Sequence, residues 1–486
     1  MQNKFLLLLV FITSLTFSQD KEVTKDTTVV FKKRVLESTE VDFMVSYYKQ
    51  DGVHSSVSGG MGSEKLTNLA SNIIVAMPLN EDDVLTVDMG LSAYTSASSS
   101  NINPYNKSGA SGGGGDDDKN KLLDGGGGIV APTGTPWQAS SGASAQDVLA
   151  SAVINYSHSS DSRNFIWNAD VAFSNEYDYT SIGFGGGIAK LFNEKNSEIS
   201  FKINAYLDQW RPIYPTELHE YGIYGAGFQT SGFFSGITVL DQSGVASTAY
   251  LPSKFSLWNS TARNSYSASV GFSQVLTKKS QISFFFDILK QEGMLSTPYH
   301  RIYFADKANY YIGTASDIPN YESPNNLGVY RLADDIERLP NSRFKFPIGM
   351  RWNYYISERL ILRTYYRYYT DNWDITAHTA SVELPIKITD KFTVFPIYRY
   401  YSQTQSKYFA PFEKHLSTEQ YYTSDYDLST FNANQYGFGV SYTDLFTATK
   451  IWKFGLKNID FRFNHYDRSD GLNSNIGTIG FKFVVQ

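Results

Sequence analysis

The chain of 486 residues contains no cysteine. It therefore forms no disulfide bond, builds no metal site from thiolates and carries no lipid on an N-terminal cysteine. Beyond its N-terminal segment it also lacks any run of 18 apolar residues, which excludes a membrane-spanning helix. Basic residues are not in excess, because 42 Lys and Arg stand against 48 Asp and Glu, for a net charge of −6. Without a basic surface, we expect no nucleic-acid partner.

Aromatic residues, in contrast, are abundant. The chain has 35 Tyr and 33 Phe, and Phe, Trp and Tyr together make up 15% of it. Aromatic side chains are enriched at both interfaces of membrane proteins, where their amphipathic rings sit at the level of the lipid headgroups. Aromatic girdles explain this composition better than a soluble core does.

The clearest pattern in the sequence runs through residues 344–402. Phe346, Ile348 and Met350 share one parity, while Lys345 and Arg351 occupy the other. A period of two predicts strands with one apolar and one polar face. Strands in soluble sheets usually run about 5–6 residues, whereas these segments approach the roughly 9–11 residues of a tilted strand that crosses a bilayer. The pattern therefore predicts an all-β fold, a transmembrane antiparallel β-barrel.

The same alternation recurs through residues 38–486 and predicts about 16 strands, with 14 as the alternative. Long breaks join odd strands to even ones near residues 96–146, 211–262, 292–343 and 404–431. Short turns join even strands to odd ones near residues 80, 160, 194, 279, 358, 390 and 447. We therefore expect long extracellular loops at one end of the barrel, with the turns and both termini in the periplasm.

The N-terminus is typical of an exported protein. Lys4 precedes an apolar stretch over residues 5–17, and small residues follow before Gln19. This pattern predicts a signal peptide over residues 1–18 and a charged periplasmic tail over residues 19–37. Export together with membrane strands indicates the outer membrane of a Gram-negative cell, with outer-membrane lipid around the barrel.

Several longer segments carry a family likeness: TSASSSNINP (95–104), PWQASSGAS (136–144), STPYHRIYF (296–304), DNWDITAHT (371–379), FPIYRYYSQTQSKYF (395–409) and YYTSDYDLS (421–429). Together they resemble a Bacteroidetes-type outer-membrane β-barrel family classed as a domain of unknown function. The resemblance covers nearly the whole mature chain and implies the barrel and its location. It implies no functional residue, and it points only to a role in a larger envelope assembly.

An acidic segment between two glycine tetrads is a candidate calcium site. Asp116, Asp118, Asn120 and Asp124 offer oxygen ligands, the first three at alternate positions. However, Lys121 stands where a calcium loop of the EF-hand type needs glycine, and no glutamate completes the loop. A solvated acidic loop tip is the alternative interpretation.

No catalytic group is expected. The histidines lack metal-binding spacing, and no stretch resembles a nucleophile elbow. Serine, histidine and acid could meet on the rim, as His300 with Asp306, or His415 with Ser417 and Asp425. Such pairings arise by chance in a serine-rich chain, so the sequence predicts no enzyme and no cofactor.

Charges on the polar parity are predicted to face the lumen. Our candidate site residues are Arg351, Arg363, Arg367, Arg399, Asp287 and Glu383. Charges of both signs on the inner face of a barrel either line an aqueous channel or form salt bridges that fill the interior. The sequence leaves these two interpretations open.

Two functions follow from these patterns. In the first, the barrel is a structural and interaction platform within a cell-envelope assembly. Its aromatic loops would fold inward, pack on each other and occlude the lumen, and lipoprotein or periplasmic partners would bind to it. In the alternative, the barrel is a porin-like channel for small solutes, for which 16 strands leave enough room.

Overall fold

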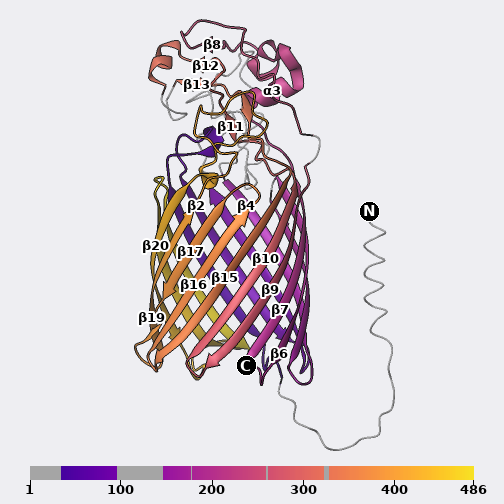
Figure 1. Cartoon of the computed structure of the whole chain (residues 1–486), viewed down its shortest axis with the longest axis vertical. Helices are drawn as coiled ribbons and strands as arrows, with labels where there is room; N and C mark the ends of the chain where they lie inside the picture. The colour runs from indigo at the N-terminus through magenta and orange to yellow at the C-terminus, as the bar shows by residue number, and fades with distance from the viewer. Residues whose placement is uncertain (1–33, 96–145, 177, 259–260, 322–327, 486) are drawn as a thin grey trace, which may run out of the picture. The chain divides into compact units, whose positions relative to one another are not determined.

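The computed structural model of the protein describes residues 34–95, 146–176, 178–258, 261–321 and 328–485. Its main body is a closed antiparallel β-barrel of 16 long strands (Figure 1). They are β1 (Glu40–Asp51), β2 (Leu66–Pro78), β3 (Asp83–Thr95), β4 (Gln146–Ser159), β5 (Phe165–Asn175), β6 (Tyr179–Phe192), β7 (Ser197–Trp210), β9 (Arg263–Thr277), β10 (Ser280–Gly293), β15 (Ser342–Ser357), β16 (Leu360–Asp371), β17 (Thr376–Glu383), β19 (Phe392–Gln403), β20 (Phe431–Thr443), β22 (Phe454–Arg468) and β23 (Asn473–Val485). Two short strands, β18 (Ile386–Lys387) and β21 (Lys450–Ile451), extend the same sheet. The sixteen predicted strands are confirmed.

The barrel closes between its first and last strands. β1 pairs with β23 from Glu40 opposite Val484 to Asp51 opposite Asn473. Lys482 adds ion pairs at this seam, at 2.7 Å to Glu40 and 3.2 Å to Asp42. Because closure pairs the strand edges, the backbone groups of the barrel are satisfied within the sheet, as a bilayer requires.

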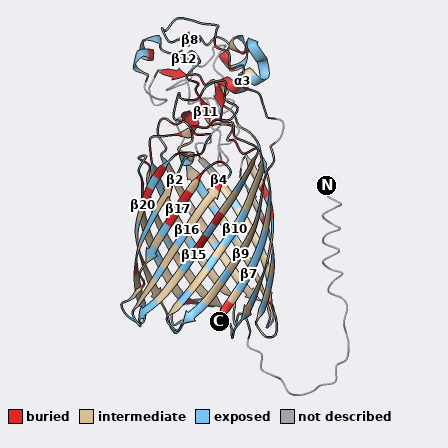
Figure 2. Ribbon diagram, viewed as in Figure 1, coloured by how far each residue is buried: buried red, intermediate tan, exposed pale blue. Residues whose placement is uncertain are grey.

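The outer face of the barrel is apolar. Phe184, Phe284, Ile348 and Phe438 lie in mid-strand, with 46–52% of their surface exposed. Exposed residues follow the strands along the barrel wall (Figure 2). Large apolar side chains left on the surface of a closed barrel are the lipid-facing residues of a membrane protein. Among the described helices, none combines the length and the apolar character that crossing a membrane would require.

The long connections gather at one end of the barrel, which we call the cap end; the other end is the turn end. The cap comprises residues 52–65, 211–258, 294–321, 328–341 and 404–430, and it lies beyond the strand ends (Figure 1). It contains η1 (Ser56–Ser58), α3 (Thr216–Tyr224), η4 (Gly225–Thr230), η5 (Gly232–Phe234), β8 (Leu240–Asp241), β11 (Arg301–Ile302), β12 (Tyr310–Gly313), η6 (Ala315–Asn320), β13 (Val329–Arg331), β14 (Asp335–Ile336) and η7 (Tyr426–Leu428).

The cap has a hydrophobic core of its own. Phe228 and Phe234 of the 211–258 segment pack with Ile312 and Tyr330 of the next connection. A further cluster joins Phe304 to Tyr422 of the 404–430 connection, with the two rings edge to face at 5.1 Å. The sequence predicted loops that fold into the lumen. The described loops instead meet beyond the strands, because their apolar side chains bury one another.

Candidate functional site

The predicted lumen charges lie on one face of the sheet. Arg363 stands opposite Glu383 in the register of β16 and β17, and Arg367 is four residues further along the same strand. Ser381, two residues before Glu383, stands opposite Arg399. Because side chains alternate along a strand, these charged residues share a face.

An ion pair that crosses the sheet supports the lumenal direction of this face. Glu383 of β17 accepts from Arg363 at 2.7 Å and from Arg462 of β22 at 3.2 Å. β19 and β20 stand between β17 and β22 in the sheet. Side chains that far apart in the sheet meet most directly across the inside of the curved wall, as expected for lumen-facing residues.

Further lumen candidates surround a hollow of about 590 Å³ beside β7, β9, β10, β15 and β16. Asp287, Arg351 and Arg367 line it, together with Lys202. The guanidinium of Arg351 lies 5.7 Å from the ring of Phe285 and 5.6 Å from that of Tyr365. Both charge signs thus meet in one hollow, with aromatic faces that hold the cation.

A buried ion pair joins three connections of the cap. Arg301 and Glu217 are both fully buried, and Arg301 Nε lies 2.9 Å from Glu217 Oε1. Arg301 also donates to the Val57 carbonyl at 3.2 Å, while Glu217 accepts from the Ala333 N–H at 3.3 Å. Buried charges need such partners, so removing one would leave the other unpaired.

Another group of polar contacts ties the 404–430 connection to the rest of the cap. Asp335, also fully buried, accepts from Arg338 at 3.0 Å and from the Tyr422 hydroxyl at 2.6 Å. At the barrel rim, Arg468 of β22 pairs with Asp427 at 2.5 Å, and the Gln403 side chain donates to the Ser429 carbonyl at 2.6 Å. The cap is thus held both to itself and to the strand ends.

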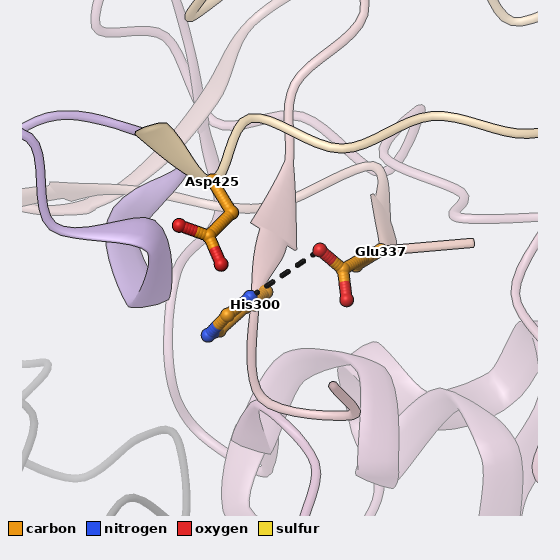
Figure 3. A group of neighbouring side chains, drawn as sticks. All are labelled: His300, Glu337 and Asp425. Atoms are coloured by element: carbon orange, nitrogen blue, oxygen red, sulfur yellow. Dashed lines mark hydrogen bonds and ion pairs between the residues drawn. The ribbon is translucent and has the colours of Figure 1, made fainter. Parts of the chain in front are cut away.

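Where three cap connections meet, His300 lies between Glu337 and Asp425 (Figure 3). One ligand atom from each of the three residues lies within 4.8 Å of the others. His300 Nδ1 is 3.5 Å from Glu337 Oε2, and its Nε2 is 3.0 Å from Ser56 Oγ. Glu337 also accepts from the Thr297 N–H at 2.7 Å and the Thr423 hydroxyl at 2.5 Å. The cluster therefore offers one imidazole and two carboxylates on a fixed frame.

The electrostatics of this cluster differ from group to group. Burial raises the pKa of Asp425, helped by the charge of Asp427, to about 7. Burial alone would lower the pKa of His300, but its contact with Glu337 outweighs this and raises it. Burial alone would raise the pKa of Glu337, but hydrogen bonds from His300, Thr423 and Thr297 outweigh it and lower this pKa below its usual value.

The two hydrolase groupings considered from the sequence do not assemble. His300 contacts Ser56 and Glu337, whereas Asp306 accepts from the Ser417 hydroxyl at 2.7 Å. Both ring nitrogens of His415 are engaged, by Glu419 at 2.6 Å and by the Thr423 carbonyl at 2.9 Å. No nitrogen of His415 is left to act as a base for Ser417.

The calcium candidates Asp116, Asp118, Asn120 and Asp124 lie outside the described residues, as do the predicted signal peptide over residues 1–18 and most of the predicted tail. Sequence reasoning missed the cluster of His300, Glu337 and Asp425. The charged run of residues 334–338 within an aromatic-rich connection was the available signal, but it does not indicate which residues meet.

The closed barrel and its apolar outer face identify an outer-membrane β-barrel. A family profile described as "Protein of unknown function (DUF3570)" matches residues 7–480. No curated protein matches the chain.

Among solved structures, the chain is similar to a bacterial polysaccharide outer membrane secretin, with 9% identity, 92% of this chain and 98% of that chain covered and a TM-score of 0.39. It is also similar to a Pseudomonas aeruginosa FadL homologue, with 10% identity, 93% and 90% covered and a TM-score of 0.35. A third similar structure is the P. putida toluene transporter TodX, with 8% identity, 93% and 91% covered and a TM-score of 0.36.

Proposed function

The chain belongs to the family described as "Protein of unknown function (DUF3570)", and from its structure we propose that it is an interaction platform of the cell envelope. In this role the barrel anchors the protein in the outer membrane, and the cap closes the barrel mouth and presents the surface that partners bind. The single observation that carries the proposal is the cap, in which three connections share hydrophobic clusters and the connection from β1 joins them through a hydrogen bond to the Val57 carbonyl.

The way the cap is held together supports closure of the mouth. Arg301 and Glu217 hold connections from β1, β7 and β10 to one another, and Asp335 with Tyr422 brings in the connection from β19. These contacts lie in buried surroundings, where an unpaired charge costs several kcal/mol. Connections with so many buried mutual contacts resist the separation that an open pore would need.

The cap also exposes apolar side chains of a kind that partners bind. Ile223 and Tyr224, at the end of α3, are 53% and 46% exposed, and Val245 is 60% exposed. On the barrel wall such residues meet lipid, but the cap lies beyond the strands, so its apolar residues have no lipid to contact. A lipoprotein or another envelope protein is the partner class that fits a surface fixed at the membrane.

Site-specific photocrosslinking in intact cells tests this proposal. A crosslinking amino acid at Tyr224, on the cap, is expected to give a discrete protein adduct. The same amino acid at Tyr436, which is 56% exposed on the barrel wall, is the matched control and should give none, because lipid surrounds it. Absence of adducts from Tyr224 and from a second cap position, Val245, would contradict the platform.

A channel for small solutes is the second candidate, and a specific observation favours it. The hollow of about 590 Å³ is lined by Asp287, Arg351 and Arg367, and a second hollow of about 500 Å³ is lined by Asp42, Asp460 and Lys482 among others. Charged walls around open volume suit hydrated solutes. In that case the cap would act as a gate, and steady conductance would accompany the intact protein.

A further inference from the structure

The cluster of His300, Glu337 and Asp425 has the donor set of a metal site. One imidazole nitrogen and two carboxylate oxygens are ligands that Zn²⁺ and related divalent transition metals accept. They come from two connections that are distant in sequence, since His300 and Glu337 flank β11 and β14 whereas Asp425 precedes η7. Figure 3 shows all three side chains converging on one small space.

The distances fit an ion in this space. Zinc binds nitrogen and oxygen ligands at about 2.0–2.2 Å, so two neighbouring ligands of a tetrahedral ion lie roughly 3.4 Å apart. His300 Nδ1 and Glu337 Oε2 are 3.5 Å apart, which is longer than a good hydrogen bond. Because all three ligand atoms lie within 4.8 Å of one another, Asp425 completes the set by moving at most about 1.5 Å.

The surrounding hydrogen bonds prepare the ligands. When Nε2 of His300 carries the proton and donates to Ser56 Oγ at 3.0 Å, Nδ1 presents its lone pair toward Glu337. A metal-bound histidine is typically held by such a contact from its other nitrogen. Glu337 is fixed by Thr297 and Thr423, and Asp425 accepts from the Asp427 N–H at 2.9 Å through Oδ1.

The two carboxyl groups of the cluster also favour binding of a cation. Within the described part of the chain, neither Glu337 nor Asp425 forms an ion pair with lysine or arginine, and the nearby Asp427 already pairs with Arg468. Glu337 is buried and Asp425 is partly buried, so two carboxyl groups meet one histidine in a region of low dielectric. A divalent ion bound there would take up the charge of both carboxylates.

We propose that His300, Glu337 and Asp425 bind one divalent transition-metal ion, with zinc as the best fit to the donor set. Three protein ligands leave a fourth position for water. The ion joins the 404–430 connection to the 294–341 connection, and through Ser56 it orients the connection from β1. It thus adds a further link between these connections of the cap.

Metal titration of the purified full-length protein tests this site. After treatment with a chelator, the protein is titrated with Zn²⁺ by calorimetry and with Co²⁺ by visible absorption. We expect one ion per chain and a Co²⁺ spectrum of low coordination number. Variants His300→Ala and Asp425→Asn are expected to bind at least about tenfold more weakly. His378→Ala, which removes a histidine bonded to Tyr366 on the barrel, should bind as the wild type does.

Limited proteolysis distinguishes the loss of metal binding from unfolding of the cap. Asp425→Asn keeps an oxygen that accepts the Asp427 N–H, so its cap should retain the wild-type cleavage pattern without metal. Zn²⁺ should slow cleavage of the cap in the wild type and in His378→Ala, and have no effect in Asp425→Asn. Equal affinity in Asp425→Asn and the wild type, or no bound ion in wild-type protein with an intact cap, would overturn the proposal.

Discussion

Replacing Arg301 with methionine is expected to separate the connections of the cap while the strands of the barrel stay paired. Arg301 is fully buried and reaches both carboxylate oxygens of Glu217, at 2.9 and 3.4 Å, as well as the Val57 carbonyl. Methionine has similar length but no charge. Among the described residues, Glu217 then keeps the Ala333 N–H as its remaining hydrogen-bond donor.

The size of the effect follows from this burial. Breaking a buried ion pair by removing one partner costs about 3–5 kcal/mol. Since each 1.4 kcal/mol is a factor of ten, the open form of the cap should become about a hundredfold to several thousandfold more populated. Hydrogen exchange measured by mass spectrometry should show this as lost protection in peptides from residues 211–258 and 294–321, with the barrel strands unchanged.

Two further variants serve as controls for this prediction. Lys387→Met breaks an exposed pair with Asp390 at the turn end, where the side chains are 45% and 81% exposed, and it should leave the protection of cap and barrel unchanged. The double variant Arg301→Met, Glu217→Leu removes both buried charges and should recover most of the lost protection. Wild-type protection in Arg301→Met, or equal loss in cap and barrel, would refute the reasoning.

The remaining predictions concern the barrel wall, pH and orientation. Phe284→Arg places a charge against lipid at a cost of roughly 2–4 kcal/mol and should reduce assembly, measured by heat-modifiable migration on gels. Ser283→Arg, on the lumen face, should assemble nearly as the wild type does. Equal loss of assembly in both variants would contradict a wall with one lipid-facing and one lumen-facing side. Burial raises the pKa of Asp334 from 3.8 to about 6, so the contribution of this one group to cap stability, about 3 kcal/mol, is fully present below about pH 4 and is lost as pH rises through 6. Asp334→Asn should remove that dependence in thermal melts of the cap, and an unchanged pH profile would reject the assignment. Because the chain has no cysteine, single cysteines can report orientation: a membrane-impermeant maleimide should label Val245→Cys in intact cells but not Asp390→Cys, and the reverse would invert the topology.

The barrel was predictable because its signal is local. Phe346, Ile348 and Met350 alternate with polar residues since lipid lies on one side of the wall and the lumen on the other. The same parity placed Arg363 and Glu383 on one face, and the register agrees. The alternation of residues did not reveal how side chains pack inside the lumen. Gly349, for example, lies beneath the Phe285 ring, and a Cβ added at Gly349 would approach that ring to 2.3 Å.

The cap was not predictable in this way. Its decisive contacts join residues that are far apart in the sequence, such as Arg301 with Glu217 and Tyr422 with Asp335. No periodicity specifies such pairs, because irregular connections have none. The abundance of Tyr and Phe in these segments indicated that they would pack, and the clusters of Phe228 and Phe304 show that they do. The place where the loops meet depends on long-range tertiary contacts, which the sequence pattern does not specify.

The conductance of the purified full-length protein in a planar lipid bilayer tests the closed cap most directly. We predict no steady open current for the wild type, because the cap is held across the barrel mouth by buried contacts. Current should appear in Arg301→Met and be suppressed again in the double variant with Glu217→Leu. A large and steady current through the wild-type protein would contradict a closed platform and establish a channel in its place.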